Sequence, residues 1–321
     1  MNVHAPLASA ELDPATTAFA ADVTAALSQQ PKKLSPKYFY DEAGSQLFEQ
    51  ITKLPEYYPT RTELDILRAR GKDISSIIPN DAALVEFGAG ATTKVRLLLE
   101  QCSFGAYVPV DISGDFLAGQ AAELRKDFPE LDVFPVNADF TTTFDLPAEV
   151  KAMPKVGFFP GSTLGNFDPQ DAAGFLRSAR QILGKGAMML IGIDLEKDES
   201  VLQAAYNDAA GVTGAFNKNV LVRINRELGG DFDLGAFTHR AIYNKERHRI
   251  EMHLIAKKPQ TVHLFGRSFD FRAGESIHTE SSYKYSMERF AALARTSGWE
   301  PKSSWTDADE QFSVHALVAA E

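Results

Sequence analysis

The stretch ALVEFGAGATTK, residues 83–94, joins a short apolar run to a pair of glycines and to the start of a helical pattern. An apolar run of this length that ends at a glycine predicts a buried strand leading into a turn. Gly88 and Gly90 have no Cβ, so the backbone at this turn can bend tightly and approach a ligand closely. The stretch therefore predicts a strand, a ligand-binding turn and a helix, in that order.

Strands and helices continue to alternate after this stretch. Strand-like runs and the helical patterns between them lie at residues 83–87, 93–102, 106–113, 114–129, 131–140, 155–162, 169–184 and 186–195. An alternation of apolar strands with helices of this length predicts a parallel sheet that is covered by helices on both faces. The fold class is therefore α/β, with a Rossmann-like, doubly wound sheet.

Acidic residues stand at the ends of two further strands in this series. Asp111 lies 21 residues after Gly90, where a carboxylate can accept hydrogen bonds from both hydroxyls of a ribose. Asp139 follows the next run, and the ring of Phe140 beside it can stack on a base. Because the carboxyl ends of parallel strands meet at one edge of a sheet, these groups predict a site for an adenosine-containing ligand.

The residues around the glycine turn favour S-adenosylmethionine over a dinucleotide. Dinucleotide-binding turns carry a third glycine beside the pyrophosphate, but this position is Thr93. Glu86 precedes the turn, and a carboxylate suits a cationic sulfonium better than a pyrophosphate. Lys94 can meet the carboxylate of the cofactor. A nicotinamide oxidoreductase and a catalytically silent binding module are the alternatives from other classes.

Longer unusual strings surround this core. They are KYFYDEAGSQLF (37–48), LPEYYPTRT (54–62), GSTLGN (161–166), AYNDAAGVTGAFN (205–217), EM (251–252) and TESSYK (279–284). Together with the glycine turn and the two strand-end acids, they closely resemble the histidine-specific Nα-methyltransferases that open ergothioneine biosynthesis. The resemblance covers residues 33–318. It implies a class I methyltransferase that converts L-histidine to its trimethyl betaine, hercynine, with three molecules of S-adenosylmethionine and no metal.

The resemblance also implies roles for individual residues. The cofactor would be held by Gly88, Lys94, Asp111, Asp139 and Phe140. The substrate carboxylate would be taken by Asn166 and Tyr206. The imidazole would be read by Tyr57, Glu280 and Ser282, with Ser281 between the last two and Met252 packed beside the ring. The amine pocket would be lined by Tyr40, Phe48 and Gly161, and Tyr40 would orient the amine for methyl transfer.

The regular alternation stops after residue 196, where helical patterns and then strand-like patterns follow. We expect residues 61–196 and 286–321 to form the cofactor-binding core. Residues 1–60 and 197–285 are expected to form a smaller α+β substrate-binding domain over the carboxyl edge of the sheet. Other side chains are interpreted as structural: Tyr58 as a core residue and Asp194 as a loop or helix-start carboxylate.

Composition limits the partners of the chain. The net charge of −10 argues against nucleic acid, because phosphate binding needs clustered lysines and arginines. No apolar run reaches the length of a membrane span and no signal peptide is recognised at the N-terminus, so we expect neither a membrane partner nor secretion. The chain is expected to act in the cytoplasm and as a monomer. Cys102 is the only cysteine, and His248 and His253 lie in a strand-like stretch without zinc-ligand spacing. No metal site is therefore expected.

The residues that face the substrate ring separate two possible substrates. A carboxylate at Glu280 beside the bulky Met252 suits imidazole, whereas the indole of tryptophan needs a larger and less polar space. Glu280 and Ser282 are two residues apart in a strand-like stretch, so their side chains share one face. L-histidine is therefore the expected substrate, and another amino acid such as tryptophan is the alternative.

Overall fold

The computed structural model of the chain describes residues 14–320, which fall into two compact units. The larger unit comprises Tyr58–Asp198, Lys245–Arg249 and the residues from Ser281 onward. The smaller unit comprises the residues up to Tyr57, together with Glu199–Asn244 and Ile250–Glu280. Three separate segments therefore build each unit.

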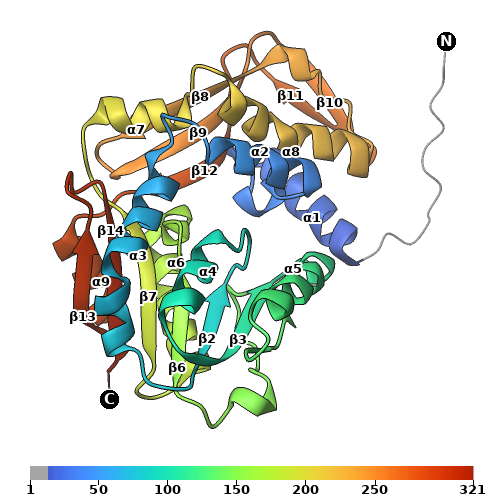
Figure 1. Ribbon diagram of the computed structural model, residues 1–321. Helices are drawn as coiled ribbons and strands as arrows, with labels where there is room; N and C mark the ends of the chain where they lie inside the picture. The colour runs from blue at the N-terminus through green and yellow to red at the C-terminus, as the bar shows by residue number, and fades with distance from the viewer. Residues whose placement is uncertain (1–13, 321) are drawn as a thin grey trace. The chain divides into compact units, whose positions relative to one another are not determined.

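A mixed sheet forms the centre of the larger unit, with the strand order β13-β14-β7-β6-β2-β3-β4 and with β5 paired to β3 (Figure 1). The strands from β2 to β7 pair in parallel, whereas β14 is antiparallel to both β7 and β13. The bounds are β2 (Ala82–Phe87), β3 (Phe104–Asp111), β4 (Asp132–Val133), β5 (Val136–Asn137), β6 (Lys155–Phe159), β7 (Met188–Asp194), β13 (Trp299–Thr306) and β14 (Phe312–Ala319).

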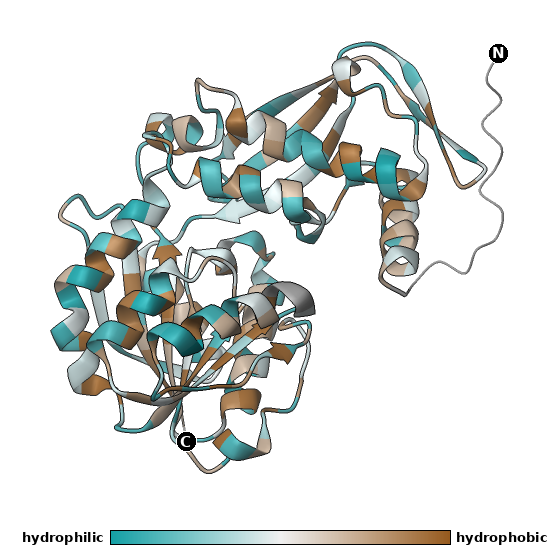
Figure 2. Cartoon of the chain, turned by 45° about the vertical axis from the view of Figure 1, so that its right-hand side comes forward, coloured by the Kyte–Doolittle hydropathy of each residue, from teal (hydrophilic) through white to brown (hydrophobic). Residues whose placement is uncertain are grey.

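Helices cover both faces of this sheet. One face packs on α3 (Tyr58–Ile77), α4 (Thr93–Gln101) and α5 (Gly114–Asp127), and the other on α6 (Pro169–Leu183) and α9 (Met287–Thr296). Alternate strand residues enter different cores, as Leu84 and Val85 do in β2. Figure 2 shows hydrophobic residues in the strands and hydrophilic residues on the outer sides of the helices. The expected doubly wound α/β fold is confirmed.

The strand order also locates the ligand edge of the sheet. The chain runs from β2 outward to β3 and β4, and then returns to place β6 on the other side of β2. In a doubly wound sheet, ligands bind outside the carboxyl ends of the strands at such a reversal. The glycine turn after β2 and the loop after β6, which contains the short helix η3 (Thr163–Asn166), stand at this point.

The smaller unit contains a sheet with the strand order β1-β12-β9-β8 and a separate hairpin of β10 and β11. The helix α8 packs against α2 and β8, and α7 also packs against β8. The bounds are α1 (Pro14–Ser28), β1 (Lys32–Lys33), α2 (Glu42–Ile51), α7 (Glu199–Tyr206), α8 (Val212–Leu228), β8 (Phe237–Asn244), β9 (Arg249–Ala256), β10 (Gln260–Leu264), β11 (Arg267–Phe271) and β12 (Ser276–Tyr283).

Two segments differ from the sequence-based expectation. The run at 131–140 was expected to be one strand, but it forms only β4 and β5, because Pro135 between them has no N–H group for the ladder. The strand β13, which contains Pro301, was not expected. It lies at the edge of the sheet with an irregular register between Pro301 and Ser303, where a proline is tolerated. Across the described residues 14–320, every helix falls short of what a membrane span requires.

Candidate active site

The glycine turn after β2 has the backbone geometry that the sequence predicts. Gly88 has a φ of +74°, which favours glycine, and the N–H groups of Gly88 and Ala89 both donate to the carbonyl of Val110 at 2.9 and 3.0 Å. A Cβ added at Gly88 would lie 3.1 Å from the ring of Phe140. The turn and Phe140 therefore stand side by side, as a site for a base beside a glycine turn requires.

The two strand-end acids have different surroundings. Asp111 is the last residue of β3, where its Oδ1 accepts the N–H of Ser113 at 3.0 Å and burial raises its pKa. Asp139 lies two residues beyond β5, and its Oδ1 accepts from the N–H and the hydroxyl of Thr141 at 2.9 and 2.5 Å. Ile112, which the sequence did not single out, is 57% exposed directly after Asp111. An exposed apolar side chain here can cover one face of a bound base.

A buried carboxylate that the sequence did not reveal joins the glycine turn to the loop after β6. Glu63 on α3 is 1% exposed, and its Oε2 lies 2.6 Å from the Nζ of Lys94. Both of its carboxylate oxygens also accept the N–H of Gly161, at 3.0 and 2.8 Å. A Cβ added at Gly192 would meet the same carboxylate at 2.0 Å. Glu63 thus fixes two of the predicted site residues, Lys94 and Gly161.

The loop after β6 is held by close backbone contacts. Ser162 has a φ of +56°, its carbonyl accepts the N–H of Gly165 at 2.8 Å, and its hydroxyl accepts the N–H of Asp194 at 2.9 Å. A Cβ added at Gly165 would lie 2.7 Å from the carbonyl oxygen of Tyr283. Asn166 ends η3 and is half-buried. The loop can therefore hold the Asn166 amide in a defined position.

Asp194 is not the loop or helix-start carboxylate that the sequence suggested. It is the last residue of β7, is 1% exposed, and pairs with the Nζ atoms of Lys197 and Lys284, each at 2.6 Å. Tyr58 is buried, as expected of a core residue. Its hydroxyl also donates hydrogen bonds to the Asp194 carboxylate. Burial opposes ionisation, yet the two lysines lower the pKa of Asp194.

In the smaller unit, the predicted aromatic residues form one cluster. The ring centroids are 5.7 Å apart for Tyr40 and Phe48, 6.3 Å for Phe48 and Tyr57, and 6.2 Å for Tyr57 and Tyr206. These edge-to-face contacts present ring faces that can attract a cation. Phe216 on α8, which the sequence analysis left unassigned, packs against both Tyr40 and Phe48. Phe216 lies within the string 205–217 that carries the family resemblance, and this position could have indicated a place near the site.

Of the residues predicted to lie at the imidazole, Glu280, Ser281 and Ser282 follow one another on β12, whereas Tyr57 belongs to the aromatic cluster. Glu280 and Ser281 are both buried, and Met252 on the neighbouring strand β9 is buried as well. The carbonyl of Met252 accepts the hydroxyl of Thr279 at 3.0 Å. Tyr40 is 44% exposed, but desolvation of its hydroxyl and the negative charge of Glu280 raise its pKa well above the ordinary value. Tyr40 therefore remains a hydroxyl at neutral pH.

Comparison with known proteins identifies the family. Residues 19–319 match the family described as "Histidine-specific methyltransferase, SAM-dependent". The chain belongs to this family. Histidine N-alpha-methyltransferase of Mycolicibacterium smegmatis is 41% identical, with 95% of this chain and 96% of the relative aligned. The protein of the same description from Mycobacterium tuberculosis is 39% identical, with 91% of this chain and 92% of the relative aligned. Ergothioneine biosynthesis protein 1 of Neurospora crassa is 32% identical over 90% of this chain, which spans 33% of that protein.

A methyltransferase of this family uses S-adenosylmethionine, and the larger unit fits that cofactor. The backbone at Gly88 leaves open the space that a Cβ would take beside Phe140. The carboxylates of Asp111 and Asp139 can accept from hydroxyl and amino groups. Glu86 carries a buried carboxyl group on the strand before the turn, and burial raises its pKa to about 7. Among the described residues, no group of three or more His, Cys, Asp and Glu side chains is placed to hold a metal ion.

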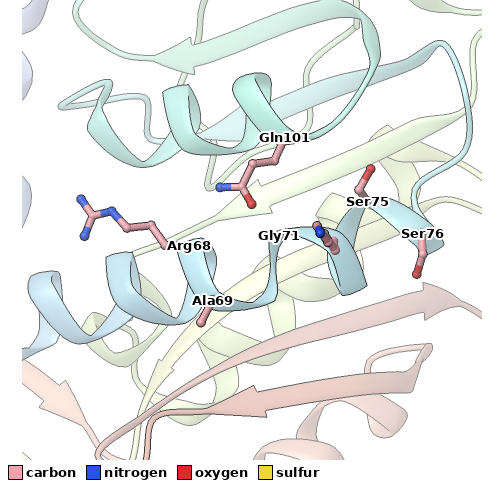
Figure 3. Close-up of a pocket in the computed structure, with 7 residues that line it drawn as sticks. Arg68, Ala69, Gly71, Ser75, Ser76 and Gln101 are labelled. Carbon is pink, nitrogen blue, oxygen red and sulfur yellow. The ribbon is translucent and has the colours of Figure 1, made fainter.

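A hollow of about 840 Å³ elsewhere in the larger unit lies apart from these residues. It is formed by α3 and α4, and Figure 3 shows Arg68, Gly71 and Gln101 among its lining residues. Gln101 is the last residue of α4. The residues of α3 that line the hollow lie in its C-terminal half, and the chain passes from there to the amino end of β2. The hollow is therefore at the edge of the sheet opposite the glycine turn.

Proposed function

We propose that this methyltransferase transfers three methyl groups in succession from S-adenosylmethionine to the α-amino nitrogen of L-histidine. The product is hercynine, and the reaction is the first step of ergothioneine biosynthesis. Membership of the histidine-specific family supports this proposal, as do relatives described as histidine N-alpha-methyltransferases that align over nearly their whole length. The single observation that carries it furthest is the match of residues 19–319 to that family.

The chemistry requires position more than charge stabilisation. S-adenosylmethionine supplies an electrophilic methyl group on a sulfonium. The proposed cofactor residues are Gly88, Lys94, Asp111, Asp139 and Phe140. Because the displacement moves positive charge from sulfur to nitrogen and creates no oxyanion, the protein's contribution is mainly alignment, for which on the order of 7–11 kcal/mol is available.

Tyr40 has a proposed role in presenting the amine. Its raised pKa keeps it protonated, so it serves as a hydrogen-bonding hydroxyl and not as a phenolate base. In the first two transfers the neutral amine still carries an N–H, which the hydroxyl oxygen can accept and so direct the nitrogen lone pair toward the methyl group. The rings of Phe48 and Tyr57 pack beside it and can attract the growing alkylammonium by about 0.5–2 kcal/mol. Gly161 is the remaining proposed member of the amine pocket.

The remaining proposed contacts select the substrate. Asn166 and Tyr206 take its carboxylate, and Tyr57, Glu280 and Ser282, with Ser281 between them, read the imidazole beside Met252. Placing residues 1–60 and 197–285 over the carboxyl edge of the cofactor sheet is part of this proposal. So is action as a cytoplasmic monomer without a membrane partner. The net charge of −10 supports the further part of the proposal that nucleic acid is not a partner.

Initial rates of S-adenosylhomocysteine release with histidine and tryptophan test the substrate assignment. Glu280→Ala removes a buried carboxylate, so we expect the KM for histidine to rise by about tenfold to a hundredfold, as loss of a charged hydrogen bond implies. Glu300→Ala, at an exposed carboxylate paired with Arg295, is the control and should leave KM unchanged. An unchanged KM for histidine in Glu280→Ala, or wild-type turnover of tryptophan as fast as of histidine, would contradict the assignment.

A further inference from the structure

Asp194 holds two lysines that differ in what else they contact. Its Oδ1 accepts from Lys197 and its Oδ2 from Lys284, each at 2.6 Å, and the hydroxyl of Tyr58 donates to both oxygens at 2.8 and 2.9 Å. Lys197 also donates to the carbonyl of Leu195 and to the Tyr58 hydroxyl. The side chain of Lys284 is 0% exposed. A fully buried ammonium therefore lies at the carboxyl end of β7.

Lys284 donates a second hydrogen bond to Ser282. The distance from its Nζ to the Ser282 Oγ is 2.8 Å. An ammonium has donors and no acceptor, so this bond occupies a lone pair of the serine oxygen and turns the hydroxyl hydrogen away from the lysine. A charge-assisted bond of this kind also polarises the hydroxyl and makes it a better donor. The buried ion pair thus sets the hydrogen-bonding direction of Ser282.

We propose that Lys284 is a positioning residue that fixes Ser282 as the hydrogen-bond donor to the unprotonated ring nitrogen of the substrate. The inference rests on the proposed function, in which Ser282 meets the imidazole. Neutral imidazole has one N–H and one nitrogen with a free lone pair, so Glu280 accepts from the first and Ser282 donates to the second. A ring that lacks the acceptor nitrogen cannot take the hydrogen bond from Ser282, and a polar site discriminates against an analogue that loses such a bond.

The second lysine on Asp194 provides a matched control. Lys284→Met and Lys197→Met each remove one ammonium from the same buried carboxylate, and each leaves Asp194 with the other lysine and with Tyr58. Because the carboxylate keeps a partner in both variants, neither leaves an uncompensated buried charge. Only Lys284→Met removes the bond to Ser282. If methionine prevents folding, Lys284→Gln and Lys197→Gln repeat the comparison with polar side chains. Glutamine at position 284 keeps an amide donor, so Lys284→Gln should raise the KM for histidine less than Lys284→Met.

The experiment measures steady-state kinetics with histidine and with L-2-thienylalanine, an amino acid of similar ring size without a ring nitrogen. We expect Lys284→Met to raise the KM for histidine by about tenfold, with little change in kcat, in S-adenosylhomocysteine affinity or in kcat/KM for thienylalanine. Lys197→Met should keep the wild-type KM. Ser282→Ala should raise the KM for histidine in the wild type but add little in the Lys284→Met background.

Two outcomes would overturn the inference. One is an equal rise of the histidine KM in the two lysine variants, which would assign the effect to the ion pair as a whole. The other is an effect of Ser282→Ala that is independent of Lys284. A wild-type enzyme that does not turn over histidine would instead contradict the proposed function, so the two failures are distinguishable.

Discussion

Glu86 is the acid of the glycine motif, and its environment sets its protonation. The side chain is buried on β2 and its Oε2 accepts the hydroxyl of the equally buried Tyr107. Burial raises the pKa of Glu86 to about 7 from an ordinary value of 4.5, with a smaller contribution from the negative charges of Glu63 and Asp111. Near neutral pH the carboxyl group therefore titrates beside the turn proposed for a cationic cofactor.

This raised pKa has a consequence for stability. Between pH 4.5 and about 7 the folded protein keeps a proton on Glu86 that the unfolded chain releases. The contribution of Glu86 to the free energy of unfolding is therefore fully present below pH 4.5 and is lost as the pH rises through about 7. Glu86→Gln keeps an acceptor for Tyr107 without a titrating group. We expect the variant to gain on the order of 1–3 kcal/mol relative to wild type between pH 5 and pH 8. Urea denaturation at a series of pH values measures this difference, and a constant difference would contradict it.

The residues that the sequence revealed were those tied to strand ends and turns. Gly88, Asp111, Asp139 and Phe140 stand at or just after the ends of strands, and the parallel pairing of these strands puts those ends at one edge of the sheet. Glu63 was not foreseen, because it lies on the buried face of α3, one turn before Ile66 and Leu67. Helical hydrophobic periodicity identifies such a face as one that packs on the core, and does not indicate a carboxylate there. The contact from Lys284 to Ser282 depends on a carboxylate ninety residues away in the chain.

At the scale of elements, Asp41 joins α2 to α8 in the smaller unit. Its side chain caps α2 by accepting the N–H of Gly44 at 2.8 Å, and it also accepts from Asn219 and Arg226 on α8, each at 2.7 Å. Although burial opposes ionisation, these hydrogen bonds lower the pKa of Asp41 below its ordinary value of 3.8. The cap therefore fixes the helix that carries Phe48 beside Tyr40.

Loss of this cap should be measurable as a loss of stability. We expect Asp41→Ala to lower the free energy of unfolding by about 1–3 kcal/mol, because one cap and two hydrogen bonds from α8 are removed. The difference from wild type should be full above pH 3.8 and shrink as the pH falls below it. Asp233→Ala, at the exposed cap of a short helix, is the control for chemical denaturation. Equal losses in the two variants would show that the contacts with α8 contribute nothing.

Elements that depend on pairing were the hardest to predict. β4 and β5 are two residues each, and the pattern of 131–140 does not show that Pro135 divides them. β13 carries Pro301 and polar residues, and its place is set by its antiparallel partner β14. Helical periodicity is local and was read from the sequence for α4, α5, α6 and α9, whereas an edge strand is defined by a partner distant in the chain.

At the scale of the molecule, the fold class followed from the alternation of apolar runs and helices between residues 83 and 195. The order of the strands around the reversal at β2 then follows from the connection of β4 back to β6. The smaller unit gathers segments from three parts of the chain, and no periodicity records which of them pair. Its proposed placement over the cofactor sheet, and the proposed roles of both sets of residues, stay predictions.

Mass spectrometry of the purified enzyme with L-histidine and S-adenosylmethionine is a direct test of the proposed reaction. We expect successive products that are heavier than histidine by one, two and three methyl groups, and NMR of the final product should place all three on the α-nitrogen. An unchanged mass of histidine, methyl groups on the ring nitrogens, or methylation of tryptophan alone would contradict it.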